Sequence, residues 1–104
     1  MFTIEEKQER LRLHCSLTIY QAAQLWSELK GALGRVREID LAEVDECDTA
    51  GVQLLLMLKR AAAEQGRSLQ LVNHSKAVID VLGLINVAGL LGDPVVLPSE
   101  QEVH

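Results

Sequence analysis

The sequence predicts an α/β fold in which helices pack on a mixed β-sheet of about four to five strands. Two patterns indicate this fold. Apolar and polar residues alternate near the N-terminus, as in half-buried strands, and further along apolar residues recur every three or four positions, as in amphipathic helices. The two patterns then follow one another in the order ββαβαβαβ, and strands that alternate with helices form crossover connections.

The first half of the chain supplies a hairpin and a helix. Strands are expected over Phe2 to Glu6 and Glu9 to Cys15, where apolar and polar residues alternate. A helix is expected from Tyr20 to the glycines Gly31 and Gly34. Its apolar face carries Ala22, Leu25, Leu29 and Leu33.

The second half alternates strands and helices. We expect strands over Val36 to Leu41 and Ser68 to Asn73, separated by a helix from about Ala50 to Gln65 that Gly66 closes. Ser75 is placed to cap a third helix through Leu82. The segment 95–97, between Pro94 and Pro98, predicts a last strand at the sheet edge.

Length and composition predict one domain over residues 1–104 and argue against several partner classes. The chain is 48% hydrophobic with a net charge of −5, and its ten Lys and Arg residues are scattered, so no nucleic-acid partner is expected. The longest mostly apolar run falls short of the roughly 18 residues of a spanning helix, so no membrane insertion is expected. The absence of a signal peptide favours the cytoplasm.

The common signatures of enzymes and metal sites are absent. His14, His74 and His104 lack the spacing of zinc ligands, and no GxSxG, GxxxxGK[ST] or GxGxxG pattern occurs. Cys15 and Cys47 form no metal or redox motif. Asp45, Glu46 and Asp48 depart from the spacing of a calcium loop. We therefore expect no enzymatic activity, no catalytic residue, no cofactor and no metal.

The stretch DECDTAG, residues 45–51, places Thr49 between an acidic loop and an apolar helix. Six acidic residues and no basic one lie between Glu38 and Asp48, which creates a local negative field. One interpretation is structural: Asp48 or Thr49 caps the helix and stabilises it by about 1 kcal/mol. The other is functional: an exposed hydroxyl at a helix start can receive a phosphate, and Gly51 leaves room for a second backbone.

The segment Ile39 to Gly51, IDLAEVDECDTAG, resembles the signature of the STAS domain family, which includes the bacterial anti-sigma-factor antagonists. The predicted helices, the SLQLVN strand and the segment SKAVIDVLGL also fall where that family places its elements. The resemblance implies a single STAS domain with the STAS fold. Thr49 replaces the commoner Ser of the family, and the helix that ends the family's fold has no counterpart here.

The resemblance also implies a function. In such proteins the hydroxyl at the position of Thr49 is phosphorylated by a partner kinase and reset by a phosphatase. The chain is therefore expected to be a phosphoprotein of signal transduction that binds a serine/threonine kinase or an anti-sigma-type protein. Some small relatives are encoded beside chemotaxis proteins. Others are constitutive subunits of lipid-trafficking ABC transporters, and in that role Thr49 would be only a helix cap. A homodimer is a further option.

The helix after the motif is expected to present part of the partner surface. Leu54, Leu55 and Leu58 fall on its core side, while Met57 falls among polar residues. A flexible apolar side chain on an exposed face suits an adaptable interface. The expected partner-binding residues are Asp48, Ala50, Gly51, Gln53 and Met57.

Overall fold

A computed structural model of the chain describes residues 1–85. The predicted order of elements is confirmed as far as the third helix, and the strand predicted at 95–97 lies outside the described residues. The strands are β1 (Phe2–Glu5), β2 (Arg10–Leu13), β3 (Glu38–Asp40) and β4 (Gln70–Val72). The helices are α1 (Ile19–Leu29), the 3₁₀-helix η1 (Lys30–Ala32), α2 (Thr49–Glu64) and α3 (Lys76–Ile85).

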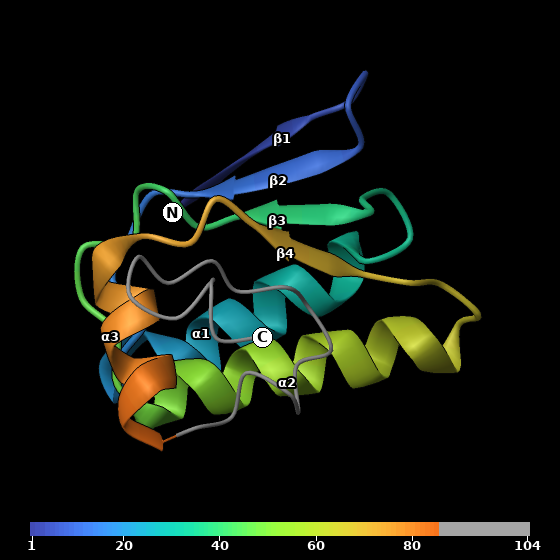
Figure 1. Cartoon of the computed structure of the whole chain (residues 1–104). Coiled ribbons are helices and arrows are strands. Elements are labelled where there is room, and N and C mark those ends of the chain that lie inside the picture. The colour runs from blue at the N-terminus through green and yellow to red at the C-terminus, as the bar shows by residue number, and fades with distance from the viewer. Residues whose placement is uncertain (86–104) are drawn as a thin grey trace, which may run out of the picture.

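The four strands form one mixed sheet in the order β1-β2-β3-β4. β1 and β2 pair antiparallel as the predicted hairpin, whereas β2, β3 and β4 run parallel to one another. The three α-helices lie on the same face of the sheet (Figure 1). Because β2 to β4 are parallel, α1, α2 and α3 all begin at one end of the sheet, and this end carries Thr49.

The core lies between the sheet and the helices and consists mainly of leucine. Alternate strand residues, such as Leu11, Ile39 and Leu71, point to the helical side and are buried. The helices contribute the leucines predicted for their apolar faces, among them Leu25, Leu29, Leu54, Leu55 and Leu58.

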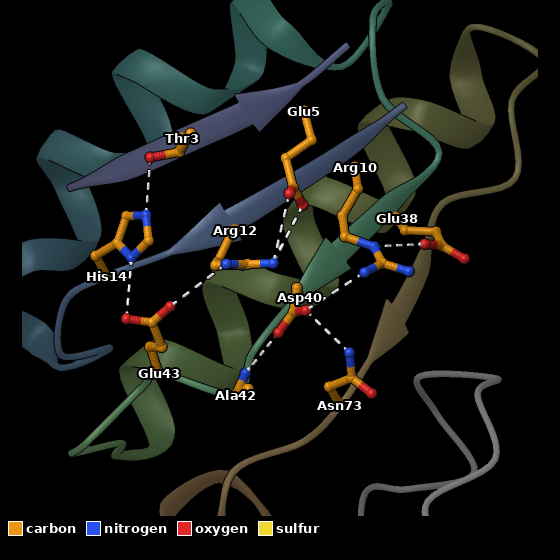
Figure 2. Close-up of polar contacts among 10 residues, drawn as sticks. All are labelled: Thr3, Glu5, Arg10, Arg12, His14, Glu38, Asp40, Ala42, Glu43 and Asn73. Atoms are coloured by element: carbon orange, nitrogen blue, oxygen red, sulfur yellow. Dashed lines mark hydrogen bonds and ion pairs between the residues drawn. The ribbon is translucent and has the colours of Figure 1, made fainter. Parts of the chain in front are cut away.

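The other face of the sheet carries charged side chains that pair across the strands (Figure 2). Arg10 Nε lies 3.0 Å from Glu38 Oε1, and Arg12 Nη2 lies 3.4 Å from Glu5 Oε1. His14 bridges Thr3 and Glu43 at the end of this row. These side chains are about one-third exposed, so solvent screens the pairs and each adds little stability.

Asp40 is the exception on this face because only 3% of it is exposed. Its carboxylate accepts hydrogen bonds from the backbone N–H of Ala42 at 2.8 Å and from Asn73 Nδ2 at 2.9 Å, and Arg10 Nη1 lies 3.8 Å away. Asn73 follows β4 with φ +54°, a left-handed conformation that asparagine tolerates. Asp40 therefore joins the ends of β3 and β4 and fixes the direction in which the chain leaves β3 toward Thr49.

The helix ends differ from the prediction by one to three residues. Thr18 caps α1 by accepting a hydrogen bond from Tyr20 N, so α1 begins at Ile19, and it continues as η1 where a single helix to Leu33 was expected. Gly66, with φ +74°, closes α2 as predicted, because its left-handed conformation lets the last carbonyls of α2 accept from Gly66 N and Arg67 N. Ser75 caps α3 as predicted, and α3 runs on to Ile85.

We expect Asp40→Ala to lower the free energy of unfolding by about 1.5–3 kcal/mol, because it removes the buried carboxylate that accepts hydrogen bonds from Ala42 N and Asn73 Nδ2. Urea unfolding followed by circular dichroism measures the change. Asp80→Ala is the matched control: Asp80 pairs with Lys76 on an exposed face, so its loss should cost less than about 0.5 kcal/mol. Equal effects of the two substitutions would contradict the role assigned to Asp40.

Candidate functional site

The loop between β3 and α2 is held against the segment that precedes α1. Leu17 and Cys47 form a parallel β-bridge, in which Leu17 N donates to Glu46 O at 2.8 Å and Asp48 N donates to Leu17 O at 3.0 Å. Ser16 Oγ adds a hydrogen bond to Asp45 Oδ1 at 2.8 Å. These contacts align the loop so that Asp48 lies where α1 and α2 both begin.

Asp48 caps α2, and its second oxygen serves α1. Oδ1 accepts a hydrogen bond from Gly51 N at 3.0 Å, and Oδ2 accepts one from Ile19 N at 3.0 Å. A carboxylate near a helix N-terminus is also favoured by the helix dipole. The interpretation of Thr49 as the helix cap is therefore wrong: Thr49 is the first residue of α2, and Asp48 performs the capping.

Another backbone segment lies against Gly51, as the sequence suggested, and it is the segment at Leu17 of the same chain. A Cβ atom at residue 51 would lie 2.8 Å from the Leu17 carbonyl carbon, closer than real Cβ contacts allow. Gly51 is buried beneath Leu17 and is not part of the exposed surface. Its absent side chain is thus what permits the bridge between Leu17 and Cys47.

Thr49 is exposed at the surface of this corner. The acidic residues Glu43, Asp45 and Glu46 are exposed as well. Residues 16–29 and 42–58, which form α1, the loop and the first part of α2, contain no Lys, Arg or His. A phosphate on Thr49 would therefore meet a negative field and no basic side chain from these segments.

An apolar groove of about 350 Å³ lies between α1 and α2, and Ala50, the residue after Thr49, contributes to its lining. Of the predicted partner-binding residues, Ala50, Gln53 and Met57 line this groove, and Met57 is 43% exposed. On the α1 side, the groove is lined by Ala22, Ala23 and Trp26. The structure thus brings three of the five predicted residues together, with Asp48 half-buried at the helix starts.

The sequence reasoning missed the contribution of α1 to this corner. Ile19 is 66% exposed and Tyr20 is 90% exposed, and both lie in the first turn of α1, next to Asp48. Trp26 is half-buried in the groove. A signal existed for Tyr20, which lies opposite the predicted apolar face, whereas Ile19 precedes the predicted helix.

The two cysteines are packing residues and poor nucleophiles. Both are partly buried against the hydrophobic core. Burial raises the pKa of the Cys47 thiol to about 11, and the negative charge of Asp48 acts in the same direction. Burial also raises the pKa of the Cys15 thiol. Both thiols therefore remain protonated at neutral pH, which suppresses their reactivity.

Residues 1–85 offer neither a metal site nor a membrane-spanning helix. No group of three or more His, Cys, Asp or Glu side chains in this range is arranged to hold a metal ion. Within the same range, every helix is too short or too polar to cross a bilayer.

Three comparisons relate the chain to known proteins. The family model described as "Mlab, STAS domain" matches residues 1–93. A search of curated proteins finds no significant match. Two solved structures resemble the fold. A protein of Thermotoga maritima, described as a candidate anti-sigma factor antagonist, is 16% identical, with a TM-score of 0.69 over 99% of this chain and 92% of its own. The anti-sigma factor antagonist SpoIIAA in its unphosphorylated form is 19% identical, with a TM-score of 0.63 over 99% of this chain and 93% of its own.

We expect Gly51→Ala to destabilise the protein by about 3 kcal/mol or more, because the added methyl group would collide with backbone that cannot move without breaking the bridge. Thermal and urea unfolding measure the loss. Gly31→Ala is the control, since nothing lies within 4 Å of a Cβ at that position, and it should be neutral or slightly stabilising. A stable Gly51→Ala protein would contradict the close approach of Leu17.

Proposed function

The chain belongs to the STAS domain family, and we propose that it is a non-enzymatic binding module whose association with a partner protein is switched by phosphorylation of Thr49. One observation carries the proposal. Thr49 is exposed at the first position of α2, while the neighbouring Asp48 supplies the cap. The helix start therefore does not require the Thr49 hydroxyl, and the next residue, Ala50, lines an apolar groove.

A phosphate on Thr49 is proposed to change binding and leave the fold nearly unchanged. It adds roughly −1.5 to −2 charges at neutral pH. The start of α2 stabilises this charge by only about 0.3–1 kcal/mol, and the acidic loop opposes it, so the two effects on stability are small and opposite. Within residues 16–29 and 42–58 there is no cation that could draw the phosphate into a new conformation.

The larger effect is expected where a partner covers the groove. Ala50, the residue after Thr49, lines this groove, so a partner seated in it would press an apolar surface close to the phosphate. Removing a dianion from water against such a surface costs several kcal/mol, which corresponds to about 10³-fold in affinity. Phosphorylation should therefore release the partner.

The proposed partners are a serine/threonine kinase or anti-sigma-type protein that binds this corner, and a phosphatase that removes the phosphate. The likeness to SpoIIAA supports this choice, because that protein is described both as an anti-sigma factor antagonist and by its phosphorylation state. The exposed Ile19 and Tyr20 extend the apolar surface beyond the groove and suit a protein partner.

A second candidate is a constitutive subunit of a lipid-trafficking ABC transporter or another scaffold. The STAS resemblance supports it, because members of that family include such subunits. In this alternative the groove is permanently occupied and Thr49 is never modified. The surface used would be the same, so the two candidates differ in the chemistry of Thr49 and not in the place of contact.

Incubation with ATP and the kinase encoded nearest to the protein should add one phosphate to the intact mass and none to Thr49→Ala. Thr3→Ala, which removes an exposed threonine on β1, is the matched control and should still be phosphorylated. Failure of every neighbouring kinase to modify the protein would favour the constitutive subunit.

Met57→Glu should weaken binding of the proposed partner protein at least tenfold in both candidates, because it places a charge in the groove. Its thermal midpoint should change by less than about 3 °C, since Met57 is exposed. Arg60→Gln lowers the net charge by the same one unit, outside the lining of this groove, and should bind normally. A large loss of stability in Met57→Glu would make Met57 a core residue and remove it from the proposed surface.

A further inference from the structure

The end of the molecule opposite Thr49 concentrates positive charge. Two segments meet there, since Gln70 N donates to Arg37 O at 2.9 Å and Arg67 Nη2 donates to Val36 O at 3.2 Å. Residues 30–37 contain three basic residues and no acid, and residues 59–67 contain three basic residues and one acid, Glu64. The basic residues are Lys30, Arg35, Arg37, Lys59, Arg60 and Arg67. Two acids of the turn between β1 and β2, Glu6 and Glu9, pair with Arg35 and Arg37. The basic residues still outnumber the acids at this end of a chain whose net charge is −5.

A polar pocket of about 490 Å³ opens in this end, and it is lined by the starts of β3 and β4, the loop after α2 and the turn between β1 and β2. Its lining side chains combine two guanidinium groups, a hydroxyl, two amides and one carboxylate: Gln8, Arg37, Glu38, Arg67, Ser68 and Gln70. The carboxylate of Glu38 is paired with Arg10 at 3.0 Å, which offsets its charge.

The fold holds Arg67 at the pocket and leaves one of its donors unused. The left-handed Gly66 turns the chain after α2, and Arg67 N then donates to Ala62 O at 2.9 Å. The guanidinium is anchored by the bond from Nη2 to Val36 O, while its Nε–H is buried and has no acceptor in the described part of the chain. A buried donor without an acceptor destabilises the protein, so a shift of the guanidinium that lets a bound group accept from Nε is favoured.

Arg37 supplies the second guanidinium of the pocket. Its side chain is 70% exposed and contacts Glu9 Oε2 through Nε at 2.6 Å. Two guanidinium groups at one pocket match the acceptor pattern of a phosphate, which accepts paired hydrogen bonds from Arg. The pocket is larger than a phosphate ion, and the amides, Ser68 and Glu38 can accept or donate hydrogen bonds to a polar group attached to it.

We propose that this pocket binds the phosphate group of a small polar phosphate ester, with Arg37 and Arg67 as its ligands. The same chemistry is offered by a free metabolite and by the headgroup of an anionic lipid. The site is independent of Thr49, because α2 has 16 residues and separates the two ends by about 24 Å.

The test is a titration of the ¹⁵N-labelled full chain, followed by NMR. The probes are inorganic phosphate, glycerol 3-phosphate, and phosphatidylcholine vesicles with or without phosphatidic acid. We expect saturable shifts of the Ser68 and Gln70 amides and of the Arg67 Nε–H with a Kd of about 1 mM or tighter. Saturation by glycerol 3-phosphate identifies a free ester as the ligand, and shifts with phosphatidic acid vesicles alone identify a lipid headgroup.

Arg37→Gln should weaken binding about tenfold without changing the thermal midpoint, because the side chain is exposed and one of two phosphate ligands is lost. Arg60→Gln is the matched control: it removes the same charge from the same end but does not line this pocket, so its affinity should be unchanged. Equal weakening by the two variants would reveal diffuse electrostatic attraction and overturn the site. The absence of saturable shifts with every probe would overturn it as well.

Discussion

The carboxylate of Asp48 is the contact on which the arrangement around Thr49 depends. One oxygen accepts from the first turn of α2 and the other from the first turn of α1, so a single side chain joins two helices that begin 30 residues apart. The backbone of Asp48 also pairs with Leu17, whose carbonyl occupies the space above Gly51. The aspartate, the glycine and the bridge therefore form one unit, and replacing any of them disturbs both helices.

This unit explains how a helix can begin at a hydroxyl that its own stability does not need. Helix starts require acceptors for their first N–H groups, and a threonine used for that purpose would be turned inward. Here the preceding aspartate satisfies the requirement, and the threonine is free to face solvent. Charge also differs between the two ends of the molecule, because acidic residues surround Thr49 and basic residues lie at the far end of α2. Each end of the molecule is therefore suited to a different kind of ligand.

Sequence patterns predicted the order of elements, the leucine face of α2 and the turn at Gly66, because these follow from local periodicity and backbone preference. They could not decide between Asp48 and Thr49 as the cap, since both residue types cap helices and the two are adjacent. The choice is made by tertiary structure: Ile19 N and Gly51 N both need an acceptor, and one carboxylate can serve the two while one hydroxyl cannot easily do so. The groove was only half predicted for the same reason. Its α2 side, with Met57, followed from the helical pattern. Trp26 and Ala23 belong to α1, which is distant in sequence, and local patterns do not predict where α1 packs.

The bridge between Leu17 and Cys47 has a consequence for short substrates. A synthetic peptide with the sequence of the acidic loop and the first turns of α2 would contain every residue of the motif. Isolated helices of that length, however, are only marginally stable in water. It would also lack Leu17 and the Ile19 amide, so its aspartate would have no second helix to join. An enzyme that recognises the folded shape of this corner would therefore not bind such a peptide. Screening on peptide arrays would miss that enzyme.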